Sequence, residues 1–403
     1  MKICQINVVY AKGSTGKIVR DLHIGLLEAG YDSMVIYPVK DKFENDKNIF
    51  TVSNKWMSRI TALYRRISGR QFDGAYIQTR RIINILKKEK PDIVHLHCIN
   101  GNNINIYKLL RFLANNKINT LLTIHAEFMY TGGCEHSFEC EKWKTYCHKC
   151  DNKSRGTFID GSSHTFKSLQ KCYQLFDKDK FKFIAVSPWL ENRAKNSPML
   201  SRFLSGTVYN GVDTSVYTYT ESDYIRNELG ILPDEKIIFH ITANFDPTSD
   251  NLKGGKFVVK LAEMLKKENV RIVIAANNIV KSKIPSNCII LGKILDSKKL
   301  AEIYSVSDIT LITSKRETFS MPTAESLCCG TPVVGFLAGG PESIALKQYS
   351  NFVEYGNIDC LYSTIIKMLN STYDKHEISK QAKQTYARQE MLNRYLKHYT
   401  AKE

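Results

Sequence analysis

The sequence predicts an α/β protein built from two doubly wound, Rossmann-like domains. The chain has 403 residues, which is more than a single hydrophobic core usually holds. Short apolar runs of strand length alternate with segments of helical periodicity, the pattern of a parallel sheet with crossover helices. A polar stretch around residues 212–234 separates two such series. Two sheets are therefore expected, one on each side of this link.

The apolar runs are the predicted strands. In the first series they lie at residues 2–9, 33–39, 92–98, 120–125, 181–187 and 206–211, with helical segments such as 18–29 and 104–115 between them. In the second series they lie at residues 236–242, 270–276, 288–291, 308–314, 332–336 and 352–355. We divide the chain into an N-terminal domain (1–212), a C-terminal domain (213–376) and a basic C-terminal helix (377–403).

The segment from Lys315 to Glu342 is the most informative for function, because it contains Glu317 and Glu325, eight residues apart. Glu317 follows a predicted strand, and ligands bind at the carboxyl ends of strands in open α/β sheets. Glu325 falls on the next helix, roughly two turns further on. Two carboxylates in these places can hold hydroxyl groups of a hexose and a ribose. Backbone N–H groups of Ser320 and Met321 at the helix start favour phosphate.

This pattern resembles the retaining glycosyltransferases of the GT-B fold that carry an E-x7-E motif, the GT4-like family. The match consists of Glu317, Phe319, Glu325 and the segments 330–334 and 339–342, while Ser320 stands where the family usually has glycine. The resemblance implies two domains that face each other across a cleft, with the nucleotide sugar on the C-terminal domain. It also implies transfer with retention and no cofactor for catalysis. The last helix commonly crosses back to the first domain in such proteins.

The same resemblance supplies the other expected donor residues. The family usually binds the leaving diphosphate with an arginine and a lysine; Lys253 matches the lysine, but Asn244 stands in place of the arginine. Gly292 and Lys293 belong to a strand and turn that resemble the base-binding segment, so uridine and guanosine donors both remain open. The expected donor-binding residues are Asn244, Lys253, Gly292, Lys293, Glu317, Thr318, Phe319, Ser320, Met321 and Glu325. Lys253 and Glu317, together with His125, are also expected to act in catalysis.

Two histidines at predicted strand ends are candidates for the N-terminal side of the cleft. A neutral imidazole at His125 can hydrogen-bond the donor sugar or a developing charge, and the family often has a histidine there. His97 is a further cleft candidate, whereas His95, two residues earlier on the same strand face, is assigned to the core.

A glycine-rich turn follows the first predicted strand and contains Gly13 and Gly16. It is not a Walker A loop, because the required flanking glycine and hydroxyl residue are replaced by Ala11 and Ile18. The resemblance places Gly13 and Gly16 near the acceptor, and Asn210 at the border of the cleft. The alternative is an ordinary tight turn between a strand and a helix.

Four cysteines, Cys134, Cys140, Cys147 and Cys150, form a Cys-rich insertion over residues 134–150. A C-x2-C pair such as Cys147 and Cys150 is a typical half of a tetrahedral zinc site. We predict structural zinc, with free thiols as the alternative. The surrounding segment resembles a subgroup of these transferases from bacterial exopolysaccharide clusters, including colanic acid enzymes. Ala126 and Phe128 depart from the aspartate and tryptophan usual in that subgroup.

A net charge of +17 indicates an anionic partner or surface. Basic residues concentrate over residues 55–90, and no nucleic-acid recognition motif accompanies them. We predict an interfacial helix that binds an anionic membrane, on the apolar residues Trp56, Ile60, Leu63, Tyr64 and Ile67. The alternative is that this stripe packs on the sheet while the arginines are solvated.

The function expected from the sequence is a metal-independent, retaining hexosyltransferase. It would move a sugar from a UDP- or GDP-linked donor to a glycan acceptor, a lipid-linked intermediate of lipopolysaccharide, capsule or exopolysaccharide. No apolar run is long enough to span a bilayer, and the first strand does not resemble a signal peptide. The expected location is the cytoplasm, peripheral at the inner face of the cytoplasmic membrane. A GT-B sugar-nucleotide isomerase and a non-catalytic zinc-stabilised binding protein are the alternatives.

Overall fold

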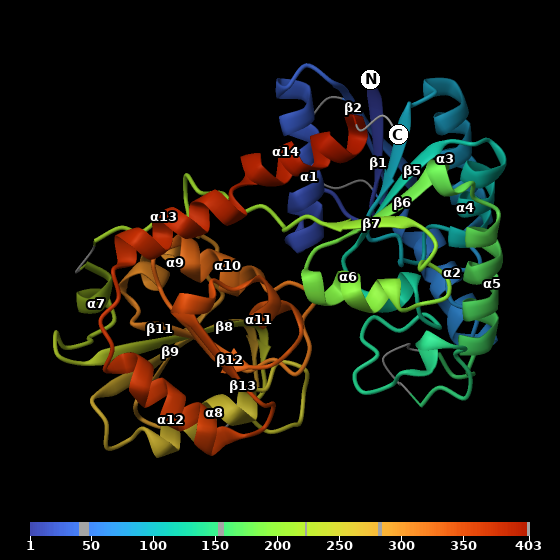
Figure 1. Cartoon of the computed structure of the whole chain (residues 1–403). Coiled ribbons are helices and arrows are strands. Elements are labelled where there is room, and N and C mark those ends of the chain that lie inside the picture. The colour runs from blue at the N-terminus through green and yellow to red at the C-terminus, as the bar shows by residue number, and fades with distance from the viewer. Residues whose placement is uncertain (40–47, 152–156, 222–223, 281–283, 401–403) are drawn as a thin grey trace. The chain divides into compact units, whose positions relative to one another are not determined.

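The computed structural model shows two compact units, each built around one parallel sheet (Figure 1). Unit 1 comprises residues 1–209 and the end of the chain from Leu392, and unit 2 comprises Asn210–Met391. The structure describes residues 1–39, 48–151, 157–221, 224–280 and 284–400. The prediction of two doubly wound, Rossmann-like sheets is confirmed.

Unit 1 has a seven-stranded parallel sheet in the order β3-β2-β1-β4-β5-β6-β7. Its strands are largely buried, as expected when crossover helices cover both faces of a parallel sheet. The strands are β1 (Lys2–Ile6), β2 (Asp32–Val39), β3 (Ile49–Ser53), β4 (Ile93–Leu96), β5 (Asn119–Ile124), β6 (Phe181–Ala185) and β7 (Leu204–Thr207). The helices are α1 (Gly13–Glu28), α2 (Lys55–Ser68), α3 (Tyr76–Glu89), α4 (Ile106–Asn115), α5 (Ser162–Gln174) and α6 (Pro188–Lys195).

Unit 2 has a six-stranded parallel sheet in the order β10-β9-β8-β11-β12-β13. The strands are β8 (Lys236–Phe245), β9 (Val270–Ile279), β10 (Cys288–Gly292), β11 (Ile309–Ile312), β12 (Val333–Phe336) and β13 (Ser350–Val353). The helices are α7 (Tyr224–Glu228), α8 (Gly255–Met264), α9 (Ser297–Val306), α10 (Met321–Cys328), α11 (Gly340–Ile344), α12 (Ile358–Leu369) and α13 (Lys375–Tyr386). Alternate residues of β8 enter different cores, Ile238 on the face of α8 and α12, and Phe239 on the face of α9.

Strand β3 is the clearest difference from the sequence expectation, which placed no strand at Ile49–Ser53. Among the described strands it pairs with β2 alone, at the edge of the sheet, and Val52 is its one buried residue. A half-buried edge strand needs few apolar residues, so its sequence carries a weak signal.

The C-terminal segment forms two helices, α13 and α14 (Arg388–Thr400), separated at Ala387, where ψ is 143°. Residues 401–403 lie outside the described part of the chain. In unit 1 the end of α14 packs against the sheet: Tyr399 OH lies 2.6 Å from His95 Nδ1, and Tyr395 OH lies 2.9 Å from Thr123 Oγ1. Unit 1 is thus formed by two segments that are distant in the sequence. None of the described helices is both long enough and apolar enough to cross a membrane.

Candidate functional site

An ion pair joins the loops at the carboxyl ends of β8 and β11 in unit 2. Lys253 Nζ donates a hydrogen bond to Glu317 Oε1 at 2.6 Å, and Ser314 Oγ donates to the same oxygen at 2.8 Å. The side chains of Lys253 and Glu317 are 32% and 17% exposed, so water and a ligand can still reach them. The structure therefore brings together two of the expected catalytic residues.

Close backbone contacts fix the two loops that carry this ion pair. Thr313 Oγ1 donates to the carbonyl of Lys253 at 2.8 Å. Gly254 has φ +68°, and a Cβ atom there would lie 2.2 Å from the carbonyl oxygen of Thr313. A Cβ atom on Gly340 would lie 2.5 Å from the backbone nitrogen of Phe319. These positions require glycine because neighbouring backbone occupies the space of a side chain.

A cavity of about 140 Å³ lies beside the ion pair. Its walls come from the ends of β8 and β11 and from the start of α10. The lining residues are His240, Ile241, Thr242, Ala243, Lys253, Ile312, Thr313, Ser314, Glu317, Ser320 and Pro322. Three expected donor-site residues, Lys253, Glu317 and Ser320, thus share one cavity at the edge where ligands bind in α/β sheets.

His240 is a lining residue that the sequence analysis did not identify. Its Nδ1 lies 3.0 Å from the carbonyl oxygen of Leu311, so Nδ1 carries the proton and donates. Its Nε2 is buried, and no described residue hydrogen-bonds to it. Burial lowers the pKa of His240 to about 4, so the ring is neutral and Nε2 is an acceptor. The sequence feature that could have indicated this role is a histidine within the apolar run of β8.

Ser320 lies at the N-terminus of α10 and has φ +82° and ψ 85°. Side chains rarely adopt this backbone conformation. Its hydroxyl accepts a hydrogen bond from Thr323 Oγ1 at 2.9 Å. Ser320 stands where the motif usually has glycine, and its backbone conformation is one that favours glycine.

The other expected donor residues differ in how close they lie to this cavity. Glu325 is half-buried on α10 and accepts a hydrogen bond from Tyr304 OH at 3.3 Å. Asn244 is exposed near the end of β8 and accepts from Asn278 Nδ2 at 2.6 Å. The cavity is not lined by Asn244, nor by Glu325, Gly292, Lys293, Thr318, Phe319 or Met321.

In unit 1, His97 and His125 follow the ends of β4 and β5 and contact each other. His97 Nδ1 lies 3.3 Å from His125 Nε2, and His97 Nε2 lies 3.2 Å from Gln5 Oε1. Burial lowers the pKa of His125 to about 4 and holds the pKa of His97 well below its usual range. Both rings are therefore neutral at pH 7. His95 is fully buried, as expected for a core residue.

The glycine turn and Asn210 occupy different parts of the chain. Gly13 begins α1 with φ +61°. A Cβ atom on Gly16 would lie 3.2 Å from the backbone nitrogen of Ala11, so the turn after β1 is tight. Asn210 is buried and is the first residue of unit 2.

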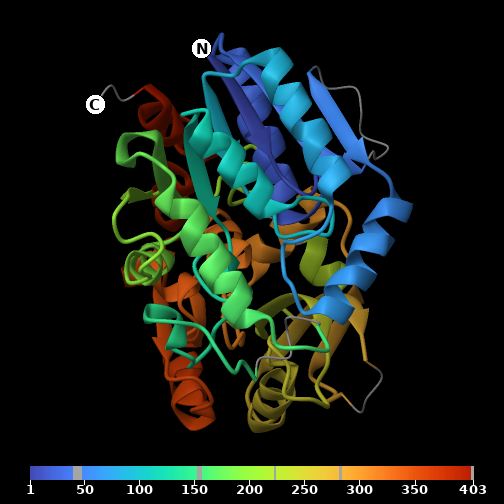
Figure 2. The ribbon, with the colours of Figure 1, turned by 90° about the vertical axis from the view of Figure 1, so that its right-hand side faces the viewer.

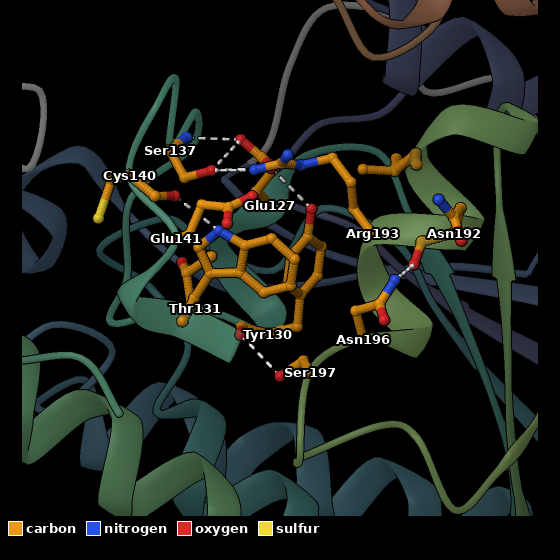
Figure 3. A network of polar contacts seen from close by, with 12 residues as sticks. Glu127, Tyr130, Thr131, Ser137, Cys140, Glu141, Asn192, Arg193, Asn196 and Ser197 are labelled. Carbon is orange, nitrogen blue, oxygen red and sulfur yellow. Dashed lines mark hydrogen bonds and ion pairs between the residues drawn. The ribbon is translucent and has the colours of Figure 1, made fainter. Parts of the chain in front are cut away.

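The Cys-rich insertion is anchored by a buried ion pair between Glu127 and Arg193 (Figure 3). Arg193 Nε donates to Glu127 Oε1 at 2.7 Å, and Tyr130 OH donates to the same oxygen at 2.8 Å. The Arg193 guanidinium also lies 4.7 Å from the ring centre of Trp143, a favourable cation–π arrangement. Trp143 Nε1 in turn donates to the carbonyl of Cys140 at 2.8 Å. These contacts connect α6 to the insertion.

The four thiols of the insertion lie in one region of unit 1 and influence one another electrostatically. Burial raises the pKa of Cys134 to about 11 and of Cys147 to about 12, and the neighbouring cysteine thiols add to both shifts. Cys140 is exposed and Cys150 is half-buried. Within the described residues, no three His, Cys, Asp or Glu side chains are arranged to hold a metal ion. In this conformation the thiols do not form a closed zinc site.

Comparisons with known proteins agree with this fold. A family described as glycosyl transferases group 1 matches residues 223–385, and one described as glycosyl transferase 4-like matches residues 25–151. The putative colanic acid biosynthesis glycosyl transferase WcaC of Escherichia coli K12 is 22% identical over 422 positions, covering 99% of both chains. The N-acetyl-alpha-D-glucosaminyl L-malate synthase of Bacillus anthracis is 26% identical over 204 residues, 48% of this chain and about half (51%) of that protein.

Solved structures share the whole fold. Anabaena HepE in complex with UDP superposes with a TM-score of 0.68 at 12% identity, covering 99% of this chain and 100% of that chain. HepE has also been solved with UDP-glucose.

The two parallel, Rossmann-like sheets and the matching family models identify a glycosyltransferase of the GT-B fold. Within that class, the chain belongs to the GT4-like glycosyltransferases.

Because the histidines of unit 1 are neutral, we predict that the free energy of unfolding falls as the pH is lowered below about 6.5. His125 stays neutral in the folded state down to about pH 4, whereas an unfolded histidine binds a proton near pH 6.5. The unfolded state therefore binds more protons in this window. His125 alone would lower the free energy of unfolding by roughly 2 kcal/mol between pH 7 and pH 5. Melting temperatures across this range should fall less steeply for His125→Gln than for the unmodified protein. Equal slopes would contradict a buried neutral His125.

Proposed function

We propose that the protein transfers a sugar from a nucleotide-diphosphate sugar to a lipid-linked intermediate of a bacterial surface polysaccharide, with retention at the anomeric carbon. The observation that carries this proposal is the Lys253–Glu317 pair beside the cavity of unit 2. The complexes of HepE with UDP and UDP-glucose support a nucleotide-sugar donor. The similarity to WcaC supports an acceptor from polysaccharide assembly.

Each polar group at the cavity has a role in this proposal. The Lys253 ammonium neutralises charge that grows on the diphosphate as its bond to the anomeric carbon breaks. Glu317 accepts hydrogen bonds from sugar hydroxyls, and His240 Nε2 accepts one more. The backbone N–H groups of Ser320 and Met321 at the start of α10 favour phosphate. Glu325 holds the ribose hydroxyls.

Retention requires the acceptor oxygen to bond to the same face of the anomeric carbon that the phosphate leaves. The departing diphosphate oxygen takes the proton of the acceptor hydroxyl, so that no protein nucleophile is needed. We assign acceptor binding to unit 1, where His97, His125 and the turn containing Gly13 and Gly16 lie at strand ends.

The two motif glutamates should affect kinetics differently. Glu325→Ala should raise the donor KM about tenfold, because the ribose is bound alike before and during transfer. Glu317→Ala should mainly lower kcat, by roughly 100-fold, because it contacts the sugar whose charge changes.

The assay is nucleotide release with and without a glycan-lipid acceptor, with exposed Glu354→Ala as the control. Release that depends on the acceptor distinguishes transfer from isomerisation and from simple binding. Wild-type kinetics in both Glu317→Ala and Glu325→Ala would rule out this donor site.

His240 provides an independent test of the cavity. His240→Phe keeps a ring of similar size but removes the Nε2 acceptor, so donor affinity should fall about tenfold, the effect of one lost hydrogen bond to a buried group. His240→Gln retains an acceptor and should lose less. Calorimetry or thermal stabilisation by UDP- and GDP-sugars measures both variants and also identifies the base. Unchanged affinity in His240→Phe would exclude His240 from donor binding.

We also propose that Cys134, Cys140, Cys147 and Cys150 bind one structural zinc ion. The four thiols influence one another electrostatically, which places them in one region, and the side chain of Cys140 is exposed. Protein purified without chelators should contain about one zinc per chain. Cys147→Ser should lose the metal and melt at a lower temperature while keeping its nucleotide affinity. Exposed Cys360→Ser is the control. Protein without stoichiometric zinc would contradict the proposal and leave four reduced thiols.

A further inference from the structure

Helix α2 presents a stripe of apolar side chains to solvent, and several of its polar side chains face the protein. Trp56 is 72% exposed, and Ile60, Leu63 and Ile67 are each 58% exposed. At about 100° per residue, these four side chains fall within about 60° of the helix circumference. Figure 2 shows α2, in blue, at the margin of unit 1. The alternative that the stripe packs on the sheet is therefore wrong.

Hydrogen bonds hold the inward face of α2 against loops of unit 1. Ser58 Oγ accepts from Asn103 Nδ2 at 3.2 Å, and Arg65 Nη1 donates to Gln71 Oε1 at 3.3 Å. Thr61 is buried on the same face, where its methyl group adjoins Gly74. The polar inner face fixes the orientation of α2, so the outward apolar stripe is a feature of the folded unit.

A second exposed segment extends the stripe. Phe158 is 84% exposed and Ile159 57% exposed. The Phe158 N–H donates to the carbonyl of Arg66 at 3.0 Å, and a Cβ atom on Gly69 would lie 2.5 Å from the Ile159 carbonyl oxygen. The resulting surface is here called the α2 patch. It consists of Trp56, Ile60, Leu63, Ile67, Phe158 and Ile159.

Positive charge borders the α2 patch. Arg59 and Arg66 are exposed and project from α2 on one side of the apolar stripe. Among the described residues, neither forms an ion pair. Arg70 forms an ion pair with Asp73, with 3.9 Å between Arg70 Nη1 and Asp73 Oδ2. Asp160 adjoins the patch, and its carboxylate accepts the backbone N–H groups of Cys150 and Ser162. The patch thus combines bulky apolar side chains with two exposed guanidinium groups.

We propose that the α2 patch docks unit 1 onto an anionic lipid bilayer. An amphipathic helix with aromatic and aliphatic residues on one side and basic residues beside them can lie in the interface plane of a membrane. Arg59 and Arg66 would then meet lipid phosphates. A symmetric contact with a second copy would instead bring like charges together, which disfavours self-association. The patch is separate from the donor cavity of unit 2, so the proposal does not depend on the donor-site assignments.

Vesicle sedimentation tests the apolar part of the proposal. The unmodified protein should bind vesicles of phosphatidylcholine with phosphatidylglycerol and bind pure phosphatidylcholine far less. Ile60→Asn combined with Leu63→Asn should weaken binding by at least about tenfold, because two side chains lose burial. The matched control is Leu232→Asn with Leu295→Asn, two exposed leucines of unit 2. Equal binding by both double variants would overturn the proposal.

The electrostatic part is tested with Arg59→Gln combined with Arg66→Gln. Each basic side chain near an anionic surface contributes about 1 kcal/mol, so affinity should fall roughly 30-fold. Lys260→Gln with Lys298→Gln removes two exposed charges of unit 2 and should have little effect. Salt at about 1 M, where the Debye length is about 3 Å, should also weaken binding. Failure to bind anionic vesicles at low salt would overturn the proposal.

Tryptophan fluorescence reports the patch directly. Trp56 is exposed, whereas Trp143 is buried and Trp189 half-buried. Emission should shift to shorter wavelength on anionic vesicles, and Trp56→Phe should abolish the shift. Sedimentation velocity without lipid should show a monomer. A dimer that Ile60→Asn with Leu63→Asn dissociates would assign the patch to a second copy and overturn the lipid proposal.

Discussion

The ion pair between Lys253 and Glu317 is the interaction on which the candidate donor site depends. Parallel strands bring β8 and β11 side by side with their carboxyl ends at one edge, so the loops after them must share a small space. The pair, the Thr313 bond to the Lys253 carbonyl and the side-chain-free Gly254 join these loops. Both side chains are partly exposed, so each can exchange one partner for a ligand. The same contact thus orders the free site and provides its binding groups.

The Glu127–Arg193 pair has a different role because it is deeply buried. Removing one partner of such a pair leaves an unpaired charge and typically costs 3–5 kcal/mol. Here the carboxylate also accepts from Tyr130 and from the backbone and hydroxyl of Ser137. Its lone pairs are therefore satisfied, which offsets the cost of burial. The insertion contains few apolar side chains, and this network, with Trp143 against Arg193, anchors it two residues after His125.

The sequence predicted the fold because buried parallel strands are continuous apolar runs, and it failed at β3, whose exposed edge needs few such residues. The spacing of Glu317 and Glu325 indicated the candidate donor region, whereas the close backbone approaches at Gly254 and Gly340 are visible only in the folded structure. The proposed role of His240 could not be predicted, because it depends on a neutral ring whose second nitrogen has no hydrogen-bond partner among the described residues. The contact of Asn244 with Asn278 likewise depends on pairing of β8 with β9, which residue types alone do not reveal.

Helix α2 shows why an apolar stripe in a sequence does not determine which face is buried. The same periodicity is expected for a helix that packs on a sheet and for one that presents its apolar side outward. The tertiary contacts decide between them: Ser58, Thr61 and Arg65 have partners or are buried within unit 1, whereas Trp56, Ile60 and Leu63 are exposed. Apolar exposure of this extent is uncommon on a monomeric surface and usually marks a binding site. Arg59 and Arg66 have no ion-pair partners among the described residues, so they favour binding to an anionic surface over a neutral one.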